Sequence, residues 1–307
     1  VFVHWDNNRT CMNVKSLAIV VLAFLPNALL LAQKDQGYRT LRMTSAFTSF
    51  PDSARANGFL DGDSVFRPAA GHYDDSSVLL VTPSHPKWGR KVDLLFWFHG
   101  WHNNIDTALQ FYGLARQFAD SKRTAVLVLP EAAKNAADSY GGKLRRDGDF
   151  RNLVGDVMKK LKDAGVVPRH AGPGEIILAC HSGGYSAVAD ILAHGGQPVD
   201  AVWLFDALYG HLPVFTDWIR TDERHRFIHW FTNHGGGTDE MSDTLMRQLR
   251  SQHVDYLLTE ETSLTPAMIR GNRILFVHSA RVHNVIINNP DDFKLLLENS
   301  LLPAAKR

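Results

Sequence analysis

One stretch of the sequence, residues 174–194, constrains the fold more than any other. Its apolar run at 176–179 has no polar alternation, which is typical of a strand buried on both faces of a sheet. The residues Cys-His-Ser-Gly-Gly follow at 180–184, and the ten residues after them carry apolar side chains at helical spacing. This pattern predicts a strand, a sharp turn and a helix, with Ser182 at the turn.

A serine at such a turn stands clear of the sheet, because the backbone bends sharply between strand and helix. The strand and the helix then come so close that small residues are needed two positions before the serine and two after it. Cys180 and Gly184 occupy these positions. We therefore interpret Cys180 as a small packing residue and not as a nucleophile.

Buried strands alternate with helices along the chain from residue 92 onward. Strands are expected at 94–98, 125–129, 176–179, 202–205, 227–231 and 274–277, and helices at 105–119, 150–164, 184–194, 241–252 and 291–299. This alternation predicts an α/β fold with one doubly wound, mostly parallel sheet. Earlier strands at 38–50 and 77–83 are expected to add antiparallel strands at the N-terminal edge, with a surface loop at 52–74 between them.

The first residues have the features of a secretory signal peptide. A lysine and an apolar run at 15–25 are followed by a small residue, Ala32, at a plausible cleavage point. Pro26 interrupts an apolar stretch already near the lower length limit for a membrane span. We expect residues 1–32 to comprise this signal peptide and a possible mis-called upstream start, and residues 33–307 to form a single domain. The mature protein would be secreted or periplasmic, without stable membrane insertion.

Charge, cysteine content and histidine spacing give no support for several kinds of partner and site. Lys and Arg number 33 against 32 for Asp and Glu, so there is no electrostatic argument for a nucleic-acid partner or an anionic membrane surface. The chain has two cysteines, and one would be removed with the signal peptide, so no disulfide is expected. The histidines lack the spacing of a metal site, and neither a metal nor a cofactor is predicted.

Functional groups in open α/β sheets gather at the carboxyl ends of the strands. The polar residues that follow the expected strands are therefore the candidates for chemistry. They are His99-Gly100-Trp101, Pro130-Glu131, Ser182, Asp206, Asp239, His278 and His283.

The order of Ser182, Asp206 and His283, with the turn around the serine and the pair at 99–100, resembles the α/β-hydrolase superfamily, in particular its secreted esterase and lipase-like serine hydrolases. The resemblance covers roughly residues 77–302. It implies a serine nucleophile, a histidine base and an acid that fixes the tautomer of the base. The sequence departs from the usual glycine two residues before the serine.

Two positions of this implied triad have competitors. His278 continues from the last expected strand, whereas His283 lies in the loop after it and can reach back toward Ser182, so we favour His283 as the base. Asp206 ends the strand at 202–205 and is the preferred acid, with Asp239 as the alternative acid.

The resemblance also implies an oxyanion hole. The backbone amide of Gly183, next to the nucleophile, is one expected donor, and the pair at 99–100 places the amide of Trp101 as the second, with Gly100 in the same loop. The Trp101 indole is expected to form a wall of the substrate pocket, and Tyr209 is expected to line it.

These features predict a secreted carboxylesterase that forms an acyl-enzyme on Ser182. The expected substrate is a small-molecule or carbohydrate-linked ester, since no large apolar flap typical of a lipase is evident. A peptidase or amidase would use the same residues, and a catalytically silent binding protein with this fold is the alternative from another class.

Overall fold

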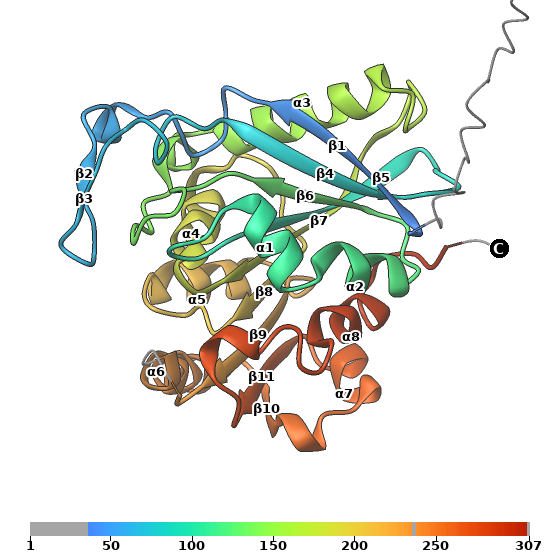
Figure 1. Cartoon of the computed structure of the whole chain (residues 1–307). Helices are drawn as coiled ribbons and strands as arrows, with labels where there is room; N and C mark the ends of the chain where they lie inside the picture. The colour runs from blue at the N-terminus through green and yellow to red at the C-terminus, as the bar shows by residue number, and fades with distance from the viewer. Residues whose placement is uncertain (1–35, 235–237, 306–307) are drawn as a thin grey trace, which may run out of the picture. The chain divides into compact units, whose positions relative to one another are not determined.

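A sheet of nine strands runs through the protein in the order β1-β4-β6-β5-β7-β8-β9-β11-β10 (Figure 1). The computed structural model describes residues 36–234 and 238–305. The expected signal peptide at 1–32 lies outside the described residues. The residues that are described belong to one compact unit.

The strands of this sheet are β1 Tyr38–Thr44, β4 Ser77–Pro83, β5 Lys91–Phe98, β6 Val126–Pro130, β7 Gly172–His181, β8 Ala201–Phe205, β9 Arg226–Thr232, β10 Leu257–Glu260 and β11 Ile274–Ser279. The α-helices are α1 Ile105–Phe111, α2 Leu114–Asp120, α3 Asp149–Asp163, α4 Tyr185–His194, α5 Leu212–Thr221, α6 Thr238–Ser251, α7 Pro266–Gly271 and α8 Asp292–Glu298. A separate antiparallel hairpin pairs β2 Phe59–Leu60 with β3 Phe66–Arg67.

The sheet is parallel except at one edge. β1 pairs antiparallel with β4, and β4 pairs antiparallel with β6, whereas all the other pairs are parallel. The predicted doubly wound α/β class, with antiparallel N-terminal strands, is confirmed.

Alternate residues of each central strand enter two separate cores. In β5, Leu94, Phe96 and Phe98 pack on one face with α3, α4, α5 and α6. Leu95 and Trp97 pack on the other face with α1, α2, α7 and α8. Because both faces are covered, the strands are apolar throughout, which explains the unbroken runs in the sequence.

Some expected elements differ from those observed. The helix expected at 105–119 is two helices, because Gly113 adopts a φ of +59° and ends the first of them. The edge strand expected at 38–50 ends at Thr44. The expected surface loop at 52–74 contains the β2–β3 hairpin, and α5, α7 and β10 were not anticipated. Within the part of the chain that is described, no helix is long and apolar enough to cross a membrane.

Candidate active site

Ser182 lies directly after β7, at the start of a single helical turn that leads into α4. Its φ of +53° falls in the left-handed region, which costs a residue with a side chain about 1–2 kcal/mol. A Cβ on Gly184 would lie 2.6 Å from the carbonyl oxygen of Phe98 and 3.0 Å from Cβ of Cys180. The strand and the helix therefore meet as the sequence predicted, with no room for larger residues at 180 and 184.

Asp206 and His283 are joined across the carboxyl edge of the sheet. Asp206 ends β8, is fully buried, and accepts a hydrogen bond from His283 Nδ1. Burial alone would raise the pKa of Asp206, but hydrogen bonds from His283 and Thr238 hold it below its usual value. With its proton on Nδ1, the His283 ring leaves the lone pair of Nε2 free to accept a proton.

The two competing residues lie elsewhere. His278 is part of β11, and its Nδ1 lies 2.9 Å from Oε2 of Glu260. Asp239 lies in the first turn of α6. The structure thus brings Asp206 to His283, and of the two candidate bases His283 lines the cavity that contains Ser182 whereas His278 does not.

The second carboxylate oxygen of Asp206 is held by residues that the sequence did not single out. It accepts hydrogen bonds from the Thr238 hydroxyl and, at 3.3 Å, from the backbone amide of Thr232. Thr238 is the first residue of α6, and a threonine at the start of a helix is ordinarily interpreted from the sequence as a helix cap. These contacts hold the carboxylate oxygen that does not contact His283.

His181, the residue before Ser182, contacts the expected base, His283. Its Nε2 donates to the backbone carbonyl oxygen of His283 at 3.1 Å, so its Nδ1 accepts from the Tyr112 hydroxyl at 2.9 Å. The rings of His181 and His283 lie 4.4 Å apart. Burial lowers the pKa of His181 to about 3, so this ring stays neutral beside the base.

The loop between β5 and α1 touches the turn that carries Ser182. A Cβ on Gly100 would lie 2.6 Å from Cβ of Ser182 and 3.2 Å from the amide nitrogen of Gly183. A Cβ on Gly183 would lie 2.5 Å from Cδ1 of Trp101, so the indole packs on this glycine. Both expected oxyanion donors, the amides of Gly183 and Trp101, therefore belong to segments in direct contact.

A buried hydrogen bond sets the orientation of the peptide between Gly100 and Trp101. Nδ1 of His99, which is 3% exposed, donates to the carbonyl oxygen of Gly100 at 2.8 Å. The C=O and N–H of a trans peptide point in opposite directions. The Trp101 N–H is therefore directed away from the buried His99.

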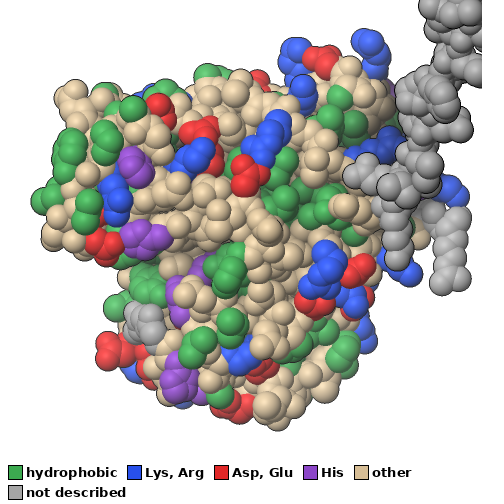
Figure 2. Space-filling model, in the orientation of Figure 1, with side chains coloured by type: hydrophobic (Ala, Val, Ile, Leu, Met, Phe, Trp, Pro, Cys, Tyr) green, Lys and Arg blue, Asp and Glu red, His purple; other side chains and the backbone are tan. Residues whose placement is uncertain are grey.

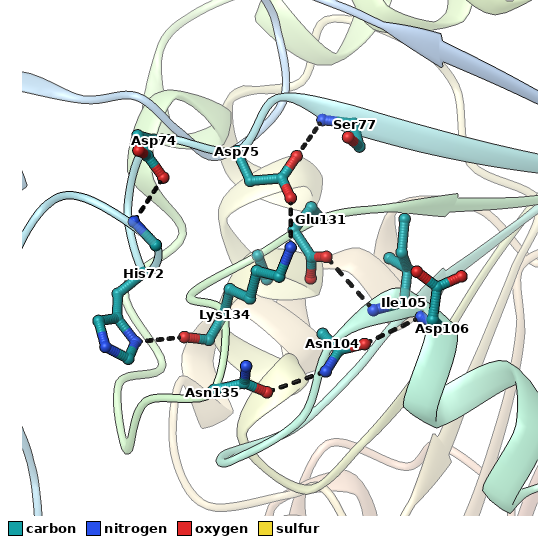
Figure 3. A network of polar contacts seen from close by, with 12 residues as sticks. His72, Asp74, Asp75, Ser77, Asn104, Ile105, Asp106, Glu131, Lys134 and Asn135 are labelled. Carbon is teal, nitrogen blue, oxygen red and sulfur yellow. Dashed lines mark hydrogen bonds and ion pairs between the residues drawn. The ribbon is translucent and has the colours of Figure 1, made fainter. Parts of the chain in front are cut away.

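Glu131, directly after β6, holds His99 in turn. Its Oε1 lies 2.7 Å from Nε2 of His99, and its Oε2 accepts from the amide of Ile105 at 3.4 Å. Figure 3 shows the contact between Glu131 and Ile105 beside the hydrogen bond of 2.9 Å between Asn104 and Asn135, which joins the same two loops. No role was assigned to Glu131 from the sequence, where its position just past a strand was the available signal.

The loop after β6 is itself fastened on its far side. The ammonium of Lys134 lies 2.7 Å from Oδ2 of Asp75, and the Lys134 carbonyl oxygen accepts from Nδ1 of His72 at 2.7 Å (Figure 3). The loop between β5 and α1 thus contacts the loop after β6, and that loop is held in turn by residues that precede β4.

A cavity of about 740 Å³ is lined in part by Ser182. Trp101 forms part of its wall, with the indole N–H donating to the Ser139 hydroxyl at 2.8 Å. The side chains that line the cavity include no Lys, Arg, Asp or Glu. They belong to Trp101, His102, Asn103, Thr107, Phe111, Tyr112, Ser139, His181, Ser182, Gly183, Tyr185, Tyr209, His283 and Asn284.

Ser182, His283 and Tyr209 face this cavity together. Burial raises the pKa of the Tyr209 hydroxyl, so that it stays protonated. Among the residues that the structure describes, no direct hydrogen bond joins Ser182 to His283. Such bonds are often long before a substrate is bound.

No cluster of three or more His, Cys, Asp or Glu side chains in residues 36–234 and 238–305 is arranged to hold a metal ion. The dispersed histidines instead have separate partners. His229, for example, is buried and bonds Ser242 at 2.9 Å, and His225 bonds the carbonyl oxygen of Trp218 at 2.7 Å.

No family model and no curated protein matches this chain. Similar solved structures include MPT51 from Mycobacterium tuberculosis, with a TM-score of 0.50 at 12% identity over 77% of this chain and 97% of that one. An S-formylglutathione hydrolase from Agrobacterium tumefaciens has a TM-score of 0.49 at 10% identity, covering 87% and 95% of the two chains. A feruloyl esterase module from Clostridium thermocellum has a TM-score of 0.48 at 11% identity, covering 89% and 92%.

At such low identity, the likeness to MPT51 concerns the fold alone. That likeness agrees with the strand order of the sheet and with the strand, turn and helix around Ser182. The chain has the α/β-hydrolase fold.

Proposed function

We propose that this chain is a serine hydrolase that cleaves carboxylic esters through an acyl-enzyme on Ser182. One observation carries the proposal. His283 is oriented by the buried carboxylate of Asp206 and lines the same cavity as Ser182. A hydroxyl, a base and an acid in this relation constitute the chemistry of nucleophilic acyl transfer.

In the proposed reaction, the Ser182 hydroxyl attacks the ester carbonyl carbon and its proton passes to His283 Nε2. The amides of Gly183 and Trp101 stabilise the negative charge on the carbonyl oxygen. The ester C–O bond then breaks, and His283 gives its proton to the departing alcohol. Water, deprotonated by the same histidine, attacks the acyl-enzyme and releases the acid with Ser182 restored.

Labelling with a fluorophosphonate tests the nucleophile. The folded protein should form one adduct, on the peptide that contains Ser182, and hydrolyse p-nitrophenyl acetate. Ser182→Ala should lose both properties. Ser186→Ala removes an exposed hydroxyl one turn along α4 and should retain both. An unlabelled Ser182 in folded protein would refute the proposal.

A second comparison tests whether the enzyme prefers an alcohol or an amine as the leaving group. We propose an esterase, so p-nitrophenyl esters should be cleaved far faster than p-nitroanilides with the same acyl group. A peptidase or amidase with the same triad predicts comparable rates. A silent binding protein predicts no turnover of either substrate, with ligand binding unchanged in Ser182→Ala.

The site of action is proposed as extracellular or periplasmic, with a small-molecule or carbohydrate-linked ester as substrate and no nucleic-acid partner. The signal-peptide pattern at 1–32 and the nearly even charge support this. N-terminal sequencing of the protein from the secreted and periplasmic fractions should give Gln33 as the first residue. Intact chain confined to the cytoplasm would contradict the proposal.

A further inference from the structure

Exposed large hydrophobic side chains are concentrated around the candidate active site. Of the eight that the described residues expose, two, Leu258 and Leu301, lie elsewhere. Three are on the β2–β3 hairpin, two line the cavity, and one directly precedes His283. We call these six residues the apolar rim: Leu60, Val65, Phe66, Trp101, Phe111 and Val282.

The hairpin turns its apolar face to solvent. Leu60 and Phe66 are opposite each other in the register, and each is 59% exposed. Their neighbours Phe59 and Arg67 form the other pair, and the Phe59 ring packs against the Arg55 guanidinium at 3.5 Å. An ordinary half-buried hairpin exposes polar residues. Figure 2 shows the hydrophobic side chains on this arm, at the left of the view.

The hairpin is continuous with the wall of the cavity. A Cβ on Gly62, in the hairpin loop, would lie 2.7 Å from Cη2 of Trp101. The Gly62 amide donates to the Ala137 carbonyl oxygen at 2.8 Å, and Asp63 lies 2.9 Å from Nε2 of His102. The indole of Trp101 therefore contacts the hairpin on one side and faces Ser182 on the other.

The charges of this surface are already paired. Asp61 binds Arg67 at 2.7 Å within the hairpin, and Asp63 pairs with His102. The cavity is lined without Lys, Arg, Asp or Glu. An ionic ligand would find no unpaired partner among these groups, whereas an uncharged apolar one would bury the rim.

We propose that the apolar rim is the docking surface for a water-insoluble ester, from which single ester groups enter the cavity. This inference rests on the esterase chemistry of the proposed function, but it assigns a different substrate class from the small-molecule or carbohydrate-linked ester named there. A small dissolved ester fits wholly within about 740 Å³ and gains nothing from exposed residues outside. An emulsified or polymeric ester presents an extended apolar surface that covers the hairpin and the cavity mouth together.

The test compares one dissolved and one emulsified substrate on the full chain. Leu60→Ser with Phe66→Ser should lower the rate on a tributyrin emulsion at least tenfold and leave kcat/KM for p-nitrophenyl acetate within twofold. Leu258→Ser with Leu301→Ser removes the two exposed leucines outside the rim and should leave both rates within twofold. In wild type, the rate on tributyrin should rise steeply once its solubility limit is passed.

Binding is measured separately with Ser182→Ala, which should sediment with emulsion droplets and lose this property when the two hairpin substitutions are added. Circular dichroism verifies folding, and Phe66→Ser alone carries the test should the double variant not fold. Equal losses on both substrates, or no loss on the emulsion, would overturn the inference. The inference would also be overturned if the hairpin substitutions changed only self-association or the binding of another protein.

The outcome also separates this inference from the proposed function. Wild type that hydrolyses p-nitrophenyl acetate but not the emulsion refutes the docking surface alone. Wild type that hydrolyses neither substrate refutes the esterase itself.

Discussion

Asp206 holds His283 through one carboxylate oxygen and is itself held through the other. Asp206→Asn keeps the shape but offers an N–H where the ring needs an acceptor, which favours the wrong tautomer of His283. We expect kcat on p-nitrophenyl acetate to fall roughly ten-thousand-fold. Asp239→Asn, the matched change at the other candidate, should stay within twofold. The reverse result would assign the acid to Asp239.

Thr238 contributes through Asp206 and not through substrate. Thr238→Val removes one charge-assisted hydrogen bond of about 1.5–3 kcal/mol and raises the pKa of the carboxyl that it contacts. We expect kcat to fall at least tenfold with KM unchanged. Thr244→Val, an exposed position of α6, is the control. A change in KM alone would show that Thr238 acts elsewhere.

At the residue scale, the sequence identified side chains that follow strands and missed those that act by tertiary contact. Ser182, Asp206 and His283 stand out because each lies just past a buried run. His181 does not, since its partners are 69 and 102 residues away in the chain. Only the packed sheet edge brings such groups together.

Among the elements, the end of β6 controls the loop after β5. Glu131→Ala removes the partner of His99 and frees the peptide that carries the Trp101 amide, so we expect kcat to fall 10- to 100-fold. Glu131→Gln retains a hydrogen bond to His99 and should recover most of this loss. A boronic acid that mimics the tetrahedral intermediate should bind in the same order. Equal kcat for both variants would contradict this role.

Elements buried on both faces were predictable, whereas exposed ones were not. The apolar runs within β5 to β9 have hydrophobic side chains on both faces, so burial is the stable arrangement for them. The region of the β2–β3 hairpin was predicted as a loop because it is rich in Gly, Asp, Ser and Ala. The outward pair of the hairpin, Leu60 and Phe66, also inverts the usual pattern of a strand. The split between α1 and α2 depends on one left-handed glycine, Gly113, which a helical spacing of apolar residues tolerates.

For the whole molecule, buried neutral histidines link stability to pH. Burial lowers the pKa of His229 to about 4, against about 6.5 in the unfolded chain. As the pH falls through this interval, His229 takes up a proton in the unfolded chain but not in the native state. The free energy of unfolding therefore decreases. The stability advantage over His229→Gln should shrink by up to about 1.4 kcal/mol per pH unit between pH 6 and 4.5, measured by urea unfolding. A difference independent of pH would contradict this.

The fold class followed from alternating strands and helices, but the order of the strands did not. The periodicity of apolar residues predicts which segments are buried, but it does not predict which strands pair with one another. The positions of β6 outside β5 and of β11 inside β10 are set by tertiary pairing alone. For the same reason, the sequence left two acids open, and the packed sheet edge brings one of them, Asp206, to His283.

The placement of β11 has a consequence for the time course of folding. β10 pairs with no strand of the sheet other than β11, which lies between it and β9 although it is made last. Chains are synthesised from the N-terminus, so β11 is made after every other strand that the structure describes. Ser182 and Asp206 can therefore be in place while His283 is still absent. During synthesis on the ribosome, the appearance of turnover should lag behind the formation of the central sheet, because turnover requires residues that follow β11.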